Sequence, residues 1–117
     1  MLAVASWIEE NPHNILGLWL SQYTSSGPLS EMVVLALFRA LSFNQHVTVF
    51  QLSVNSCSCD LAPLWDSLTN NYALEHVWFY KRANGEAEDF RKICTRNLFY
   101  QNQQRFKSVK AVTSPTQ

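Results

Sequence analysis

Cysteines and histidines are the residues with the clearest chemical potential in this chain. Cys57 and Cys59 form a C-x-C pair, and Cys94 stands far from them. The histidines are scattered singly along the chain, at His13, His46 and His76. A zinc site usually takes four ligands from closely spaced Cys or His pairs. We therefore expect no metal and no cofactor, and we expect Cys57 and Cys59 to pack as small apolar side chains.

Nucleophilic catalysis is not predicted either. An activated nucleophile needs an adjacent base and a third group that orients this base. The chain contains no G-x-S-x-G motif, no phosphate-binding glycine loop and no paired-histidine motif. His76 follows Glu75, but consecutive residues of a strand point to opposite faces. We therefore expect the chain not to be an enzyme and to have no catalytic residues.

The length and the net charge of the chain limit the classes of protein to which it can belong. The chain has 117 residues, of which 47% are hydrophobic, as expected for one globular domain. The net charge is zero, but residues 1–80 carry a net −5 and residues 81–117 a net +5. A zero total argues against a broad basic face for nucleic acid.

The compartment is predicted from the cysteines and the apolar runs. Three cysteines are an odd number, which favours a reducing compartment over a disulfide framework. No apolar run approaches the roughly 20 residues that span a bilayer, and no basic region precedes the apolar start of the chain. We therefore expect a cytoplasmic protein without a membrane partner.

Four asparagines mark the ends of a recurring apolar pattern. They lie at intervals of 33, 27 and 26 residues, at Asn11, Asn44, Asn71 and Asn97. The positions 3, 7 and 10 residues before each asparagine are apolar or small. This spacing predicts four helices with one apolar face, each ended by its asparagine in a left-handed C-cap conformation.

An extended pattern follows the first three asparagines, with apolar residues at offsets 0, 3 and 5. The pattern predicts units of helix, turn, strand and loop. Helices are expected near 1–10, 29–43, 60–70 and 86–96, and strands near 16–21, 48–53 and 75–80. The remaining segments are a loop at 24–28, a turn at 83–85, a helix or strand at 98–107 and a disordered tail at 109–117.

The middle of the chain resembles a known repeat family. The segment from Val47 to Asn55, VTVFQLSVN, is similar to the core of a leucine-rich repeat. The segment from Leu61 to Leu74 resembles the helix and lead-in of the long, ribonuclease-inhibitor-like subclass. The resemblance implies a short α/β solenoid with about three parallel strands on its concave side and helices on its convex side. The implied domain covers 1–108, with repeats near 1–23, 30–55 and 60–82 and a terminal helical cap near 86–107.

In such a solenoid, the residues between the core positions of each strand face the concave surface. Parallel stacking would place Trp19, Gln51 and Trp78 in one row. Exposed Trp and Tyr side chains on a rigid face are frequent binding anchors. The sequence therefore predicts a non-catalytic protein–protein interaction module. Its expected partner-binding residues are Trp19, Gln51, His76, Trp78, Tyr80 and Lys81.

The expected partner is another protein, and the exposed ends of so short an array favour a homodimer or docking onto a larger repeat array. Two alternatives stay open. One is a small α/β enzyme or regulator, whose strands would be apolar throughout. The other, which the zero net charge disfavours, is nucleic-acid binding through the bases Arg91, Lys92, Arg96, Arg105, Lys107 and Lys110.

Overall fold

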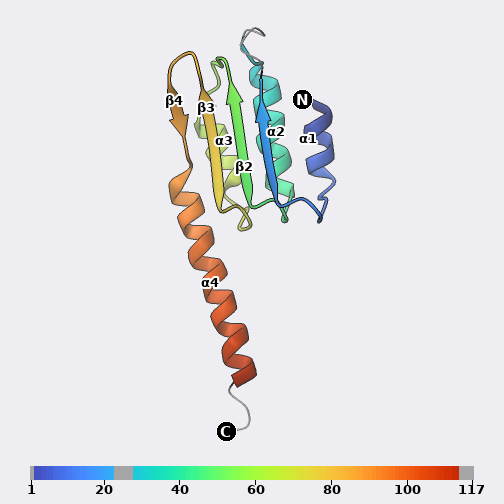
Figure 1. Cartoon of the computed structure of the whole chain (residues 1–117), viewed down its shortest axis with the longest axis vertical. Coiled ribbons are helices and arrows are strands. Elements are labelled where there is room, and N and C mark those ends of the chain that lie inside the picture. The colour runs from blue at the N-terminus through green and yellow to red at the C-terminus, as the bar shows by residue number, and fades with distance from the viewer. Residues whose placement is uncertain (1, 23–27, 114–117) are drawn as a thin grey trace.

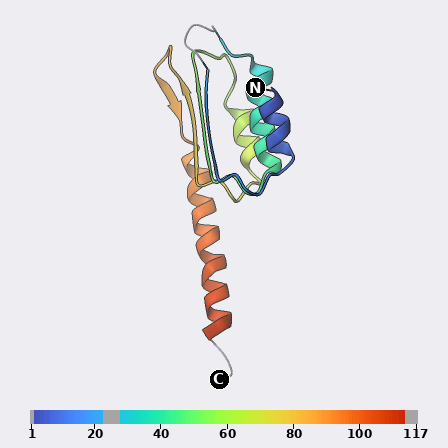
Figure 2. The same ribbon diagram turned by 45° about the vertical axis from the view of Figure 1, so that its right-hand side comes forward.

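The computed structural model describes residues 2–22 and 28–113, with side chains described as far as residue 107. Helices and strands alternate along most of the chain. Their order is α1 (Leu2–Glu9), β1 (Gly17–Ser21), α2 (Glu31–Phe43), β2 (Val49–Val54), α3 (Ala62–Leu68), β3 (His76–Lys81), β4 (Glu86–Glu88) and α4 (Arg91–Thr113). Figures 1 and 2 show α1, α2 and α3 together on one side of the sheet, and α4 running away from its lower end.

The first three strands are parallel neighbours in sequence order, as the sequence pattern predicts. The sheet has the order β1-β2-β3-β4. Trp19 is aligned with Gln51 and Gln51 with Trp78. Each pair of parallel strands is joined by a connection that contains a helix, because parallel strands need a crossover. This alternation of helix and strand produces the repeating apolar pattern in the sequence.

The predicted leucine-rich-repeat solenoid is wrong. The sheet is a mixed, open sheet of four strands that neither closes nor curls into a concave surface. After β3 the chain turns at Gly85, whose φ is 65°, and returns as β4, which pairs antiparallel with β3. This tight return replaces the next helix and parallel strand that a repeat array would need.

The C-terminal part differs from the sequence prediction in two further places. Residues 86–88 form strand β4 where a helix was expected, and the predicted cap near 86–107 is this strand followed by α4. Helix α4 extends to Thr113, so residues 109–113 belong to it and not to a tail. Residues 114–117, and residues 24–27 of the predicted loop, lie outside the described part of the chain.

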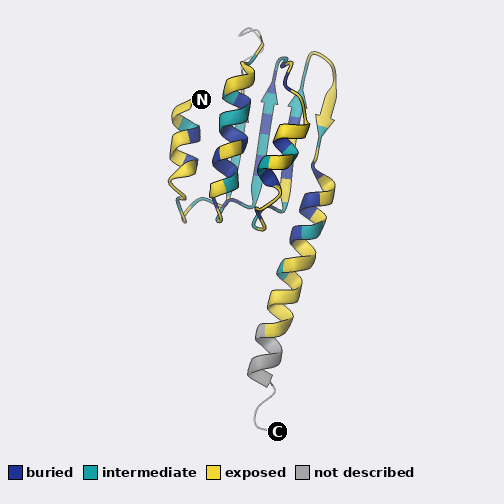
Figure 3. Ribbon diagram, turned by 180° about the vertical axis from the view of Figure 1, so that it is seen from behind, coloured by how far each residue is buried: buried dark blue, intermediate teal, exposed yellow. Residues whose placement is uncertain are grey.

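The core lies between the three helices and the sheet, and it is centred on Phe38 of α2. The ring centroid of Phe38 is 5.7 Å from that of Phe50, 6.0 Å from that of Phe79 and 5.5 Å from that of Phe90. All four rings are fully buried. Figure 3 shows buried residues along α2 and α3, which lie in front of the sheet in this view. The sheet is thus anchored from one side only.

Buried asparagines hold successive helix–strand units together. Asn71 Nδ2 donates to Leu41 O at 2.6 Å and to Asn44 O at 2.9 Å, and its Oδ1 accepts from Ala73 N at 2.8 Å. Asn44 bonds in the same way to Ile8 O, and Asn97 to Leu74 O. The side chains of Asn44 and Asn71 each satisfy backbone groups of two successive units, which would otherwise be buried without partners. Asn97 differs, because its Oδ1 accepts from the side chain of Arg96.

The four asparagines were predicted to be left-handed C-caps, and only Asn11 has this conformation, with a φ of 60°. Asn44 is the C-cap residue of α2, as predicted, but it is extended, with a φ of −93° and a ψ of 124°. Asn71 lies beyond the end of α3, and Asn97 lies within α4. The recurring asparagine therefore reflects a hydrogen-bonding role between units more than a way to end helices.

Candidate functional site

The helix-free side of the sheet gathers most of the residues that the sequence singled out. Alternation along β1, β2 and β3 places one set of side chains opposite the core. This set, called the open face below, consists of Gly17, Trp19, Ser21, Val49, Gln51, Ser53, His76, Trp78 and Tyr80. No described element covers the centre of the open face (Figure 2).

The central row of the open face combines two exposed indoles with an amide. Trp19 is 64% exposed and Trp78 is 46% exposed, and the half-buried Gln51 lies between them in register. The rings of Trp78 and Tyr80 meet edge to face, with centroids 6.3 Å apart. A depression of about 350 Å³ is lined by Gln51, Ser53, Trp78 and Tyr80. The predicted row is therefore present, and it is accessible.

Arg82 donates hydrogen bonds that connect the ends of the strands beyond this row. Arg82 follows β3, and its Nη2 donates to Gln22 O while its Nη1 donates to Ser21 Oγ at 3.3 Å. Gln22 Oε1 in turn accepts from Asn55 N at 3.1 Å. These bonds connect the ends of β1, β2 and β3 at one end of the open face. The sequence pattern gave no signal for this role, because the contacts span about 60 residues of chain.

His76 lies at the lower margin of the open face, next to the start of α4. It lines a depression of about 230 Å³ together with Arg91 and Asp89. Arg91 and Asp89 form an ion pair at 3.0 Å on the surface. His76 is therefore on the same face as the central row, but it is separated from Tyr80 by the length of β3.

Lys81 is the one predicted site residue that the structure places elsewhere. Its Nζ lies 5.7 Å from the centroid of the Phe79 ring, which is part of the core. Side chains two positions apart in a strand share a face, so Lys81 lies on the helix-covered side with Phe79. Lys81 is therefore not on the open face with the other residues of the predicted partner surface.

The cysteines are buried and pack in the core, as the sequence predicts. Cys57, Cys59 and Cys94 are buried free thiols. Burial, and then the neighbouring Cys57, raises the pKa of Cys59 to about 11, and burial also raises the pKa of Cys94. A raised pKa keeps a thiol protonated and poorly nucleophilic at neutral pH. No cluster of three or more potential metal ligands occurs within the described residues.

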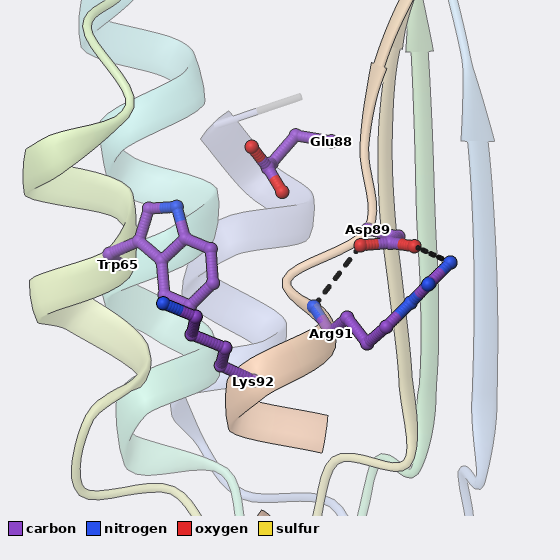
Figure 4. Close-up of a pocket in the computed structure, with 5 residues that line it drawn as sticks. All are labelled: Trp65, Glu88, Asp89, Arg91 and Lys92. Carbon is purple, nitrogen blue, oxygen red and sulfur yellow. Dashed lines mark hydrogen bonds and ion pairs between the residues drawn. The ribbon is translucent and has the colours of Figure 1, made fainter. Parts of the chain in front are cut away.

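A larger depression lies between α3 and the start of α4. It measures about 560 Å³ and is lined by Trp65, Glu88, Asp89, Arg91 and Lys92. Figure 4 shows Arg91 and Asp89 directed away from Trp65. Glu88 Oε1 accepts from Phe90 N at 3.2 Å, and Asp89 Oδ1 accepts from Arg91 N at 3.1 Å. Both carboxylates therefore accept hydrogen bonds from backbone N–H groups at the start of α4. The depression has no set of polar groups that converge on one point.

Comparisons with known proteins identify a similar fold. No family model matches the chain, and no curated protein matches it. A solved structure of actin-binding site 2 of leiomodin-1 is similar, with a TM-score of 0.69 and 22% sequence identity. The match covers 96% of this chain and 64% of that chain, so this chain spans less than two thirds of the length of its structural neighbour. That structure is named for actin binding and not for leucine-rich repeats.

The similarity supports the α/β arrangement and, at this identity, concerns the fold alone. Within residues 2–22 and 28–113, no helix is both long enough and apolar enough to cross a membrane.

Proposed function

We propose that this chain is a non-catalytic protein-interaction module that binds its partner through the open face. The observation that carries the proposal is the central row, in which two exposed indoles flank an amide on three hydrogen-bonded strands. Trp78 and Tyr80 supply large apolar contact areas with few rotatable bonds. Gln51 and Ser53 supply hydrogen-bonding groups between the rings.

The physical basis is the combination of aromatic anchors and rigidity. Trp and Tyr dominate the energetics of protein interfaces, and their truncation typically costs about 2 kcal/mol or more. The backbone of a strand that is paired on both sides is already ordered, so binding requires no further backbone ordering there. Gln51 and Trp78 lie on such strands, because β2 and β3 each have two neighbours. The centre of the open face is thus suited to bind a pre-formed protein surface.

Actin is the first partner to test. The structural neighbour is an actin-binding site of leiomodin-1, so a fold of this kind serves protein binding in that protein. The sequence identity of 22% leaves the identity of this chain's own partner to experiment.

Site-specific photo-crosslinking tests the proposal. A photoreactive phenylalanine is placed at position 49 of the open face, which leaves both indoles intact, in one sample and at the exposed position Arg39 of α2 in another. We expect one protein, actin or another, to crosslink at position 49 and not at position 39. Excess unlabelled chain should abolish the product, whereas excess Trp78→Ala chain should not. Equal crosslinking at both positions, or equal competition by both chains, would reject the open face as the binding surface.

A second candidate function, nucleic-acid binding, is favoured by the charge of α4. Residues 90–117 contain six bases and no acid. Arg96 is engaged internally with Asn71 O at 2.9 Å, but Lys92, Arg105 and Lys107 are exposed. Fluorescence anisotropy with labelled single- and double-stranded oligonucleotides tests this function. Its signature is an affinity that falls linearly with the logarithm of salt concentration and is lost in a Lys92→Glu, Arg105→Glu, Lys107→Glu variant.

A further inference from the structure

The two edges of the sheet are built differently. The outer strand β4 has only three residues, and two of them are Glu86 and Glu88. The other outer strand, β1, has five residues, GLWLS, without a charge or a proline. Natural proteins protect free edges with short strands, charges or proline, because an unprotected edge pairs with another strand. One edge of this sheet is therefore protected and the other is not.

The hydrogen bonds of β1 show which backbone groups are free. Leu16 O accepts from Thr48 N at 2.8 Å, and Gln22 N donates to Ser53 O at 2.9 Å, so the even-numbered residues of this segment face β2. Alternation then directs the N–H and C=O groups of the odd-numbered residues outward. These residues are Gly17, Trp19 and Ser21. In the described part of the chain, β1 pairs with β2 alone.

The core is incompletely covered beside this edge. In β2 the three core-facing residues are all fully buried, whereas Leu18 and Leu20 of β1 are half-buried. Val4 of α1 and Ile15 are half-buried as well. Figures 1 and 3, which view opposite sides, both show α1 beyond the edge of β1, with no strand beside it. Helix α1 thus extends beyond the edge of β1, and the apolar side chains beside this edge are only partly covered.

We propose that the free edge of β1, beside α1, takes up an extended segment of a partner protein as an additional strand. Alternate side chains of this segment are apolar and cover Leu18 and Leu20. The backbone of the segment bonds to the free groups of β1. This site lies at the edge of the sheet, and it goes beyond the proposed binding function of the open face.

The structure favours a strand of another protein over two other occupants. A helix cannot satisfy the row of backbone groups along β1, because its own N–H and C=O groups are bonded internally. A second copy of this chain that paired β1 with β1 about a two-fold axis would bring two α1 helices to the same seam, since each lies beyond its own edge. A single extended segment brings no second α1 to this edge.

The probe for the test is a peptide with the sequence of residues 47–54, flanked by lysines for solubility. In the intact chain this sequence already pairs with the other side of β1. Amide exchange is measured by NMR on the ¹⁵N-labelled chain at about 1 mM peptide. We expect exchange to slow about tenfold or more at Gly17, Trp19 and Ser21, and to change little at Leu18, whose amide already faces β2.

Matched controls separate strand addition from loose adsorption. One control peptide is N-methylated at the positions of Phe50 and Leu52. The N–H groups of these residues point to β3 in the intact chain, and in a peptide paired with the outer edge they would point to β1. This peptide should therefore not bind. Peptide N-methylated at the positions of Val49 and Gln51 should bind. In the chain, Ser21→Pro removes one outward N–H and should weaken binding about tenfold, whereas Ser21→Ala removes only the hydroxyl and should not.

Several results would overturn the proposal. One is the absence of binding at this peptide concentration, and another is binding that leaves the three outward amides unprotected. Equal binding of both N-methylated peptides would exclude backbone pairing. A concentration-dependent dimer whose three outward amides are protected without peptide would show that a second copy occupies the edge of β1.

Discussion

The indole of Trp19 lies over the backbone of Gly17, two residues earlier in β1. A Cβ atom at Gly17 would be 2.6 Å from Trp19 Cη2 and 2.7 Å from Trp19 Cζ3, which is closer than van der Waals contact allows. The missing side chain at Gly17 therefore determines where the indole rests on the open face. Glycine at this position permits a close approach of a side chain and does not serve a turn.

The substitution Gly17→Ala should displace this indole without unfolding the chain. The contact atoms belong to the far end of an exposed side chain, which can rotate away, so we expect the free energy of unfolding to change by less than about 1 kcal/mol. Partner binding should weaken severalfold, as measured by competition in the photo-crosslinking experiment. If Trp19→Ala weakens binding and Gly17→Ala does not, the observed indole position has no role.

Asn71 should be among the most sensitive polar positions of the chain. Its side chain bonds to backbone groups on both sides, and Asn71→Ala leaves several of them buried without a partner. We expect a loss of about 3 kcal/mol in the free energy of unfolding, measured with urea. The neighbouring exposed Asn70→Ala is the matched control and should cost less than about 0.5 kcal/mol. Equal effects at the two positions would contradict the role of the buried amide.

The central row could be predicted from the sequence because strand geometry leaves little freedom. Side chains alternate with a period of two, and parallel neighbours align in register, so Trp19, Gln51 and Trp78 had to meet once the strands were located. The same rule, applied to β3, places Lys81 with Phe79 on the core side. Strand β3 was located correctly from the sequence, but the side chain of Lys81 was assigned to the wrong face of this strand.

Other features depend on contacts that a local pattern does not encode. Strand β4 is short and polar, so its residues carry no apolar period that would distinguish a strand from a helix end. Phe90 follows it with a φ of 49°, which is rare for a bulky residue and is held here by burial against Phe38 and Trp65. The reversal into β4 and the direction of α4 therefore arise from tertiary packing.

Leu68 is expected to be a core anchor of α3. It is fully buried, as its position in the apolar helical pattern predicts. Leu68→Ala should cost about 2–5 kcal/mol in the free energy of unfolding, because it leaves a cavity beneath the helix. Leu61, which is exposed just before α3, provides the control, and Leu61→Ala should cost much less. A loss below about 0.5 kcal/mol for Leu68→Ala would contradict the packing of α3 described above.

Alkaline pH should destabilise the chain in part through Cys59. Burial raises the pKa of this thiol from 9.0 to about 11 in the folded state. The folded state therefore holds a proton that the unfolded state releases first, so the stabilisation is complete below pH 9 and is lost as pH rises towards 11. Urea unfolding of the wild type should show this decline, and Cys59→Ala should show a shallower one. Identical slopes would contradict the raised pKa.

The binding role of the open face is tested most directly by Trp78→Ala, measured for partner binding and for stability on the same sample. Trp78 is 46% exposed and lies opposite the core, so we expect competition for the crosslinked partner to weaken about tenfold or more. The free energy of unfolding should change by less than about 1 kcal/mol. Met32→Ala, which truncates a more exposed apolar residue on the helix side, should leave both quantities nearly unchanged. Unchanged competition by Trp78→Ala, or a loss of about 3–5 kcal/mol in stability, would contradict the account.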